Sequence, residues 1–201
     1  MRYRHTAALL ALVFGLAAGA APTESEKQTA VAIFAGGCFW CMEPPFDKLD
    51  GVLSTTSGYI GGSKVDATYK KTSSGKTGHR EAVRIEYDPV RINYTLLLEV
   101  FWRNIDPHDA RGQFCDKGRQ YTSAIFALTD EQRSLAEASK AKIESEGNLS
   151  DPIVTEILPA APFSPAEGYH QDYYKKNPVR YKLYRWSCGR DTRLEQVWGD
   201  K

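Results

Sequence analysis

The sequence predicts an α+β domain built on a split βαβ plait, followed by a long irregular C-terminal segment. Apolar and amphipathic stretches alternate along the chain in the order strand, helix, strand, strand, helix, strand. Hydrophobic residues make up 42% and charged residues 25% of the 201 residues, which is typical of a globular protein. Because no internal repeat is visible, we expect a single domain with a ferredoxin-like plait.

The predicted strands are short apolar or alternating runs that end at turn residues. Residues 30–35 are wholly apolar and stop at Gly36-Gly37, which suits a buried strand. Residues 82–87 alternate between apolar and charged side chains before Asp88-Pro89, which indicates a half-buried strand. The full set of predicted strands is 30–35, 52–60, 82–87, 123–128 and 153–158.

Three helices are predicted between these strands. Residues 39–49 look helical, although Pro44 and Pro45 permit a helix only if they lie near its first turn. A capping box of Thr129 and Gln132 starts a polar helix that ends at Gly147. The predicted helices are 39–49, 94–103 and 131–146, and the helical spacing of Leu97, Leu98, Phe101 and Trp102 places these four in the core.

The segment from Pro159 onward has a different character. It is rich in Tyr, Lys, Arg and Pro, and it lacks a clear apolar period. We therefore expect it to wrap the core with little regular structure.

The N-terminus has the three-part layout of a secretory signal peptide. Arg2 and Arg4 precede an apolar run over residues 7–18, and Ala18-Gly19-Ala20 supplies small residues for cleavage. A membrane anchor needs about 20 apolar residues, and this run is shorter. We expect residues 1–20 to be a cleaved signal peptide, residues 21–28 a flexible leader, and residues 29–201 a single catalytic domain of an exported, periplasmic protein.

Charge and cysteine content narrow the class of protein. Lys plus Arg is 26 and Asp plus Glu is 25, and this even balance argues against a nucleic-acid-binding protein. Cleavage after Ala20 would remove two Arg and no acid, so the mature charge is 24 − 25 = −1. Four cysteines in 201 residues are too few for a small protein that is held together mainly by disulfides. Export would nevertheless place these cysteines where disulfides can form and persist.

Cys38 is the strongest candidate for a reactive group. It follows the double glycine at the end of the first predicted strand and stands at the predicted start of a helix. Free N–H groups and the positive end of the helix dipole stabilise a thiolate, so we expect a lowered pKa for Cys38. Phe39 and Trp40 beside it could wall an apolar pocket. A buried inert cysteine is the alternative.

Cys38 and Cys41 also form a C-x-x-C pair. A zinc ribbon needs a second such pair, but Cys115 and Cys188 stand alone, and haem attachment needs a His where Met42 stands. Four scattered histidines do not form a metal site, so we expect no metal. A thioredoxin-like dithiol remains as an alternative.

The motifs around Cys38 resemble those of one family. Gly36-Gly37-Cys38-Phe39-Trp40 is similar to the active-site motif of the A-class peptide-methionine sulfoxide reductases. The resemblance covers roughly residues 31–174 and includes, in the family's order, residues 57–62, Tyr69, residues 78–83, residues 87–89, residues 101–102, Asp116, Gly118, residues 120–121, residues 123–125, residues 166–167 and residues 169–171.

This resemblance implies a role for each matching residue. Cys38 is the nucleophile that attacks the sulfoxide sulfur and becomes a sulfenic acid. Glu81 is the acid that protonates the sulfoxide oxygen, and it needs a raised pKa that burial would supply. The remaining implied roles are oxygen binding by Tyr69 and Tyr121, ordering of the site by Asp116, and substrate binding by Phe39 and Trp40. His79 and His170 are expected to be structural.

The thiol that resolves the sulfenic acid is open. Many family members have Gly where this chain has Cys41, and many have two cysteines in a Gly-rich tail, where this chain has only Cys188. We favour Cys188, because its tail could swing to Cys38, and we keep Cys41, one helical turn from Cys38, as the second candidate. Cys115 has no assigned task.

The predicted activity is thiol-dependent reduction of methionine S-sulfoxide, free or in proteins. The alternative is an exported C-x-x-C thiol-disulfide oxidoreductase, which would leave Glu81, Tyr69 and Tyr121 without a role. We expect no bound cofactor. The expected partners are oxidised methionine and an external thioredoxin-like thiol reductant, with no nucleic acid and no stable membrane anchor, for a protein that acts as a monomer.

Overall fold

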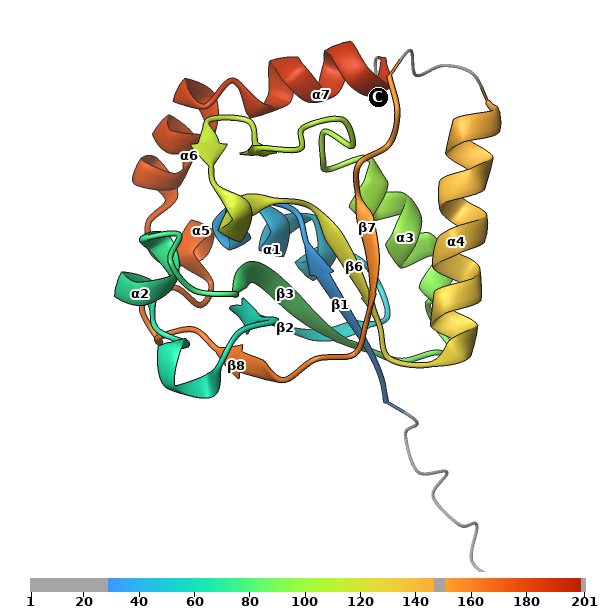
Figure 1. Cartoon of the computed structure of the whole chain (residues 1–201), viewed down its shortest axis with the longest axis horizontal. Coiled ribbons are helices and arrows are strands. Elements are labelled where there is room, and N and C mark those ends of the chain that lie inside the picture. Colours follow the sequence, from blue (N-terminus) through green and yellow to red (C-terminus); the bar gives the residue numbers. More distant parts are fainter. Residues whose placement is uncertain (1–28, 147–150, 200–201) are drawn as a thin grey trace, which may run out of the picture.

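A six-stranded sheet forms the centre of the molecule in the computed structural model, which describes residues 29–146 and 151–199 (Figure 1). The predicted signal peptide and leader lie outside the described residues. The strands are β1 (Ala30–Ala35), β2 (Val52–Ile60), β3 (Arg80–Tyr87), β6 (Ala124–Ala127), β7 (Glu156–Pro159) and β8 (Phe163–Pro165). Their order is β7-β6-β1-β3-β2-β8, and every neighbouring pair is antiparallel except β6 with β7.

The two central strands of the sheet are β1 and β3. Phe34 of β1 lies opposite Val83 of β3, and Glu81 of β3 lies opposite Tyr59 of β2. Side chains alternate between the two faces of a strand, so Phe34 joins the large apolar cluster on one face, and Ile33 joins a smaller one on the other. This register aims Glu81 and Arg80 to opposite faces of β3.

Helices cover the face of the sheet that carries the larger cluster. They are α1 (Phe39–Asp47), α3 (Tyr94–Trp102) and α4 (Asp130–Ser145), which pack against the sheet or one another. Thr129 caps α4 as predicted, because its side chain accepts a hydrogen bond from the Gln132 N–H. The connections add the short elements α2 (Tyr69–Ser73), β4 (Gly112–Gln113), β5 (Asp116–Lys117), and the 3₁₀ turns Lys64–Asp66 and Arg119–Tyr121.

The prolines of α1 do not lie where we expected them. Both Pro44 and Pro45 are inside the helix, which begins at Phe39, and not in its first turn. Proline has no N–H, so the carbonyls of Trp40 and Cys41 lose their usual helical donors. The predicted helix therefore exists, but packing of its buried residues overrides the poor local propensity.

The prediction of an irregular C-terminal segment is wrong. After β8 the chain forms three helices: α5 (Tyr173–Lys176), α6 (Pro178–Ser187) and α7 (Arg190–Trp198). Pro178 stands at the start of α6, where its missing N–H costs nothing. These helices could not be predicted from hydrophobic periodicity. Helix α6 contains no buried residue and α7 buries only Arg190 and Leu194, so neither helix has a continuous apolar stripe.

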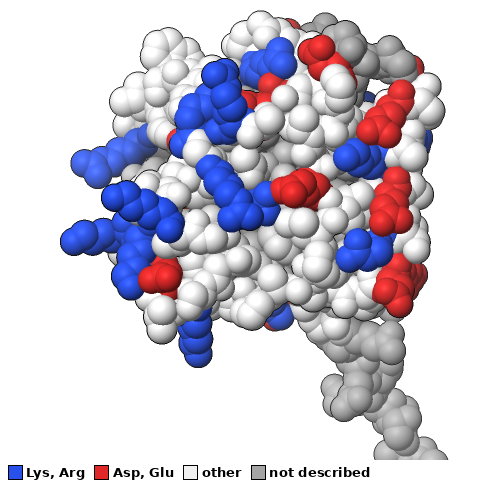
Figure 2. Space-filling view, viewed as in Figure 1, with Lys and Arg blue, Asp and Glu red and all other residues white. Residues whose placement is uncertain are grey.

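The surface carries charges of both signs. On the face shown in Figure 2, acidic side chains lie along the edge formed by α4, whereas basic side chains gather toward α2 and α6. Among the described residues, no helix combines the length and the apolar character needed to span a bilayer.

Phe34 provides a direct test of the core. Its ring lies 5.0 Å from the Phe101 ring and 5.6 Å from the Phe46 ring, and it is fully buried. We expect Phe34→Ala to lower the free energy of unfolding by roughly 3–5 kcal/mol, because it leaves a cavity at the centre of the cluster. Urea denaturation measures this change, with the exposed Val90→Ala, expected within about 0.5 kcal/mol of wild type, as control. Equal stability of the two variants would contradict this packing.

Candidate active site

Cys38 lies at the junction between β1 and α1, as predicted. It is the N-cap residue of α1, and its carbonyl accepts hydrogen bonds from the N–H groups of Cys41 (3.0 Å) and Met42 (3.3 Å). Gly37 precedes it with φ +87°, and a Cβ at Gly37 would lie 2.6 Å from Gln113 Cβ. The double glycine is therefore required for the turn that presents Cys38.

Glu81 brings a carboxyl group to the same helix end. Its Oε2 accepts a hydrogen bond from the Phe39 N–H at 3.1 Å, and the residue is only 2% exposed. Burial raises the pKa of Glu81 to about 8, and the Phe39 N–H opposes that shift only in part. The carboxyl therefore holds its proton at neutral pH, which is the state that the predicted acid requires.

Cys38 and Cys41 form a buried pair of free thiols. Their exposed fractions are 6% and 1%, and the Cys38 thiol donates a hydrogen bond to the Cys41 sulfur. Donation from Cys38 lowers the pKa of Cys41 to about 7, and the positive charge of Arg190 acts in the same direction. Cys41 is therefore the more acidic of the two thiols.

The expectation of a lowered pKa for Cys38 is wrong. Burial raises the pKa of this thiol, and the hydrogen bond to Cys41 and the nearby acids Glu81 and Asp116 raise it further. The helix N-terminus favours a thiolate, but in this position the loss of solvation outweighs that effect. Cys38 is therefore a thiol whose proton has an immediate acceptor in Cys41.

Two half-buried phenols come from separate elements of the chain. Tyr69 begins α2, and Tyr121 ends the 3₁₀ turn Arg119–Tyr121. Burial raises the pKa of both phenols, and the charges of Glu81, Cys38 and Asp116 raise each of them further. Both phenols therefore lie within electrostatic reach of Glu81 and Cys38.

Asp116 approaches the site from β5. Burial raises the pKa of its carboxyl group, and hydrogen bonding from Tyr184 opposes this shift. The Tyr184 phenol of α6 donates to Asp116 Oδ2, and burial together with the charges of Cys38 and Asp116 raises the pKa of this phenol. Sequence analysis missed Tyr184, because it lies in a helix without an apolar period.

Aromatic rings surround the start of α1. Trp40 is half-buried and stacks on Tyr173 at 3.8 Å, and its indole N–H donates to His170 Nδ1 at 3.0 Å. Phe39 is buried and lies 5.0 Å from the His170 ring. His170 therefore holds Trp40, and His79 binds backbone groups, accepting from the Gly62 N–H and contacting the Ser63 carbonyl.

Two further residues support the site without having been predicted. Glu167 accepts hydrogen bonds from the Tyr69 N–H (2.9 Å) and the Tyr59 hydroxyl (2.8 Å), which fixes the start of α2. Arg190 is 1% exposed and donates to the carbonyls of Gly36 and Asn104, below the double glycine. A buried arginine in a polar helix leaves no periodic signal that sequence analysis could detect.

The other two cysteines form a disulfide. Cys115 and Cys188 are bonded with a Cα–Cα distance of 4.9 Å, so Cys188, our favoured resolving thiol, is not free in this structure. An Asp116 carboxylate oxygen lies within 4.8 Å of both sulfurs. Because the sulfurs are bonded to each other, they are not available as thiolate ligands for a metal.

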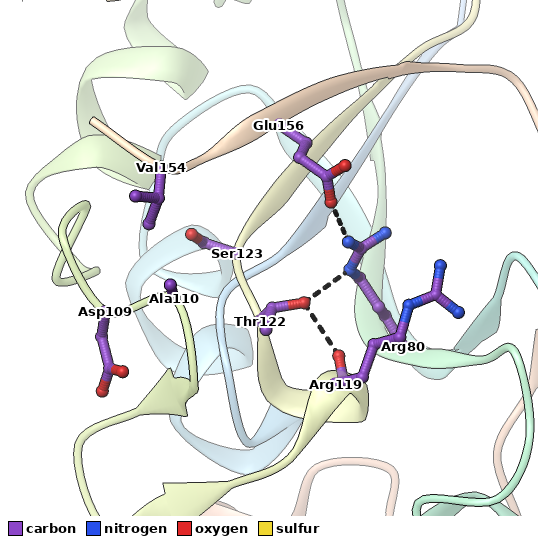
Figure 3. Close-up of a pocket in the computed structure, with 8 residues that line it drawn as sticks. All are labelled: Arg80, Asp109, Ala110, Arg119, Thr122, Ser123, Val154 and Glu156. Carbon is purple, nitrogen blue, oxygen red and sulfur yellow. Dashed lines mark hydrogen bonds and ion pairs between the residues drawn. The ribbon is translucent and has the colours of Figure 1, made fainter. Parts of the chain in front are cut away.

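A pocket of about 360 Å³ lies on the other side of β3 (Figure 3). Arg80 donates to Thr122 Oγ1 at 2.8 Å and pairs with Glu156 across this pocket. Its lining contains neither a thiol nor Glu81, because Arg80 and Glu81 alternate across the strand. This pocket is therefore separate from the site at Cys38.

A buried thiol pair beside a protonated carboxyl group defines a thiol-based redox site in a mixed α/β domain. The model of the family described as peptide methionine sulfoxide reductase matches residues 30–201, and the chain belongs to this family. The chain is similar to "Peptide methionine sulfoxide reductase MsrA" of Bacillus licheniformis, with 54% identity over 88% of this chain and 97% of the relative. The B. subtilis protein of the same name is 52% identical over 88% and 99% of the two chains.

Solved structures agree with this assignment. Mxr1 from Saccharomyces cerevisiae in reduced form is 29% identical with a TM-score of 0.70, and the match covers 75% of this chain and 87% of Mxr1. Methionine sulfoxide reductase A of Corynebacterium diphtheriae is 32% identical with a TM-score of 0.66, covering 75% and 76%. These likenesses confirm the mixed α/β fold.

The role of the Glu81 proton can be tested by removing it while keeping the shape of the side chain. We expect Glu81→Gln to slow methionine release in a single turnover by about 100-fold, because an amide cannot transfer the proton. Glu86→Gln, on the same strand but bonded to Ser54 and Arg84, is the matched control and should keep the wild-type rate. An equal rate for Glu81→Gln and wild type would rule out this acid.

Proposed function

We propose that this chain reduces methionine S-sulfoxide, free or in proteins, to methionine with thiols as the source of electrons. The observation that carries the proposal is the meeting of the Cys38 thiol with a protonated Glu81 carboxyl at the start of α1. Membership of the peptide methionine sulfoxide reductase family supports the same chemistry.

The first step is attack of the Cys38 sulfur on the sulfoxide sulfur. Cys41 accepts the thiol proton from Cys38 through the hydrogen bond between them. Glu81 gives its proton to the sulfoxide oxygen, because the sulfoxide sulfur is a poor electrophile until its oxygen is protonated, and Tyr69 and Tyr121 donate hydrogen bonds to the same oxygen. The new bond between the Cys38 sulfur and the substrate sulfur then breaks as the hydroxyl group moves to the Cys38 sulfur. Cys38 is left as a sulfenic acid, and methionine leaves with the electron pair of the broken bond.

We propose Cys41 as the resolving thiol. Its sulfur attacks the sulfenic sulfur of Cys38, the Cys38–Cys41 disulfide forms, and the oxygen departs as water. The position of the two free thiols, one helical turn apart at the start of α1, supports this assignment, whereas Cys188 is already bonded to Cys115. A thioredoxin-like dithiol then restores the pair.

The alternative function, a general thiol-disulfide oxidoreductase, has one observation in its favour. Cys38 and Cys41 are free and adjacent, as a C-x-x-C dithiol requires. That function gives no task to the protonated Glu81 or to the two phenols that share its space. The geometry therefore favours sulfoxide reduction.

We also propose a split βαβ plait as the core of the fold and a monomer as the working form. The antiparallel order β6-β1-β3-β2, in which β3 separates β1 from β2, supports the plait. The active-site groups named above all come from one copy of the chain.

The activity can be tested with a peptide that contains methionine S-sulfoxide and with dithiothreitol as reductant. We expect turnover by the wild type and none by Cys38→Ser, because a hydroxyl cannot form the sulfenic acid. Methionine formation is measured by chromatography, with Ser187→Ala as a surface control. Turnover by Cys38→Ser at the wild-type rate, or none by the wild type, would contradict the proposal.

Export is proposed from the N-terminal sequence alone. We expect cleavage after Ala20, so that the mature chain begins at Ala21 and its thiols meet an oxidising compartment. Intact-mass analysis of the protein recovered from the periplasm of an expressing bacterium measures this N-terminus. Recovery of only the uncleaved chain from the membrane fraction would contradict it.

A further inference from the structure

The 3₁₀ turn Arg119–Tyr121 carries one of the two active-site phenols, although it is only three residues long. The Tyr121 N–H donates to the Gly118 carbonyl at 3.0 Å. The Thr122 N–H donates to the Arg119 carbonyl at 3.1 Å. Because hydrogen bonds in such a tight turn have poor geometry, they stabilise it weakly. The position of the Tyr121 phenol therefore depends on contacts between the turn and neighbouring elements.

The side chain of Gln120 ties this turn to α2. Gln120 is buried, and its Nε2 donates to the carbonyl of Ser73, the last residue of α2, at 3.2 Å. Two glycines make room for the amide: an added Cβ would lie 2.5 Å from Gln120 Oε1 at Gly118 and 3.3 Å from it at Gly75. Since α2 begins at Tyr69, this contact joins the elements that carry the two phenols.

The side chain of Thr122 ties the other end of the turn to β3 (Figure 3). Its Oγ1 donates to the Arg119 carbonyl and accepts from Arg80 Nε, both at 2.8 Å. The Arg80 side chain is buried and also pairs with Glu156 of β7, so its guanidinium is held from two sides. Because Arg80 is the first residue of β3, the contact joins the turn to the strand that carries the active-site acid.

Tyr121 stands between these two anchored residues in the sequence. The anchors fix the backbone on both sides of the phenol, while Arg80 leaves β3 on the face opposite Glu81. A misplacement of about 1 Å in a group that orients the reacting atoms can cost about 100-fold in rate. Contacts outside the active site can therefore set how well the Tyr121 hydroxyl meets the sulfoxide oxygen.

We propose that Gln120 and Thr122 are positioning residues, which hold the Tyr121 hydroxyl in place relative to Tyr69 and Glu81. The inference rests on the proposed function, because it concerns a phenol that donates to the sulfoxide oxygen in that reaction. Each of the two residues acts through Tyr121. A merely structural role would lower stability and leave the reactivity of the folded chain unchanged.

Replacing the Thr122 hydroxyl tests the anchor to β3. We expect Thr122→Val to slow methionine release in a single turnover by about 30-fold, because valine keeps the shape but cannot accept from Arg80. Thr122→Ser keeps the hydroxyl and should stay within about threefold of wild type. The enzyme is held in excess over a methionine S-sulfoxide peptide. The enzyme concentration at half-saturation should not change, because Phe39 and Trp40 remain in place.

Gln120→Leu tests the anchor to α2 at similar side-chain volume. We expect it to slow methionine release by about tenfold, because leucine cannot donate to the Ser73 carbonyl. Ser54→Ala is the control, since it removes a hydrogen bond between β2 and Glu86 near the other end of β3, and it should keep the wild-type rate. A wild-type rate for Thr122→Val or for Gln120→Leu would overturn the role of that residue.

A double-mutant cycle with Tyr121→Phe separates positioning from a general effect on the fold. If Thr122 acts through the phenol hydroxyl, Thr122→Val should slow the reaction by less than about threefold once that hydroxyl is gone. Slowing by the same factor in both backgrounds would overturn the proposal. If Thr122→Val fails to fold, Gln120→Leu in the same cycle decides the question. No methionine from the wild type would instead overturn the reductase function itself.

Discussion

The hydrogen bond from the Phe39 N–H to Glu81 is the contact on which the site depends. It joins the first residue of α1 to the second residue of β3, and both residues are almost completely buried. A carboxyl group in this position keeps its proton at neutral pH because its ionised form would lose hydration. The sheet register that packs Phe34 and Val83 in the core also sets the place of this acid.

Burial disfavours the thiolate form of Cys38, and neighbouring residues oppose this effect. The same enclosure that protonates Glu81 raises the pKa of Cys38, so a free thiolate is disfavoured there. We propose that Cys41 accepts the proton of the Cys38 thiol. The positive charge of Arg190 lowers the pKa of Cys41 and so stabilises its thiolate. In the proposed reaction, Cys41 is therefore the base during the attack and the second thiol during resolution.

The sequence predicted the parts of the fold that have a strong period or a clear cap. The apolar run of β1, the alternation of β3 and the Thr129 cap of α4 are all found in the structure. The C-terminal helices escaped prediction because α6 buries none of its residues, and its contacts to the site are made by polar side chains such as Tyr184. The Cys115–Cys188 pairing spans 73 residues, which no local pattern reveals.

Prediction of the site was likewise uneven, for physical reasons. Motif order predicted a site of Cys38, Glu81, Tyr69 and Tyr121, but the pKa of Cys38 depends on how deeply the helix end is buried. Depth is a property of the packed structure, and it reversed the direction that the helix dipole alone would give.

The central claim is that Cys38 and Cys41 act as one reactive pair. The most direct test uses the chain in the state seen in the structure, with Cys115–Cys188 oxidised and the other two cysteines free. After one equivalent of methionine S-sulfoxide peptide without reductant, disulfide mapping by mass spectrometry should show Cys38 joined to Cys41. A Cys38–Cys188 disulfide, or two unchanged thiols after methionine has been released, would contradict the account.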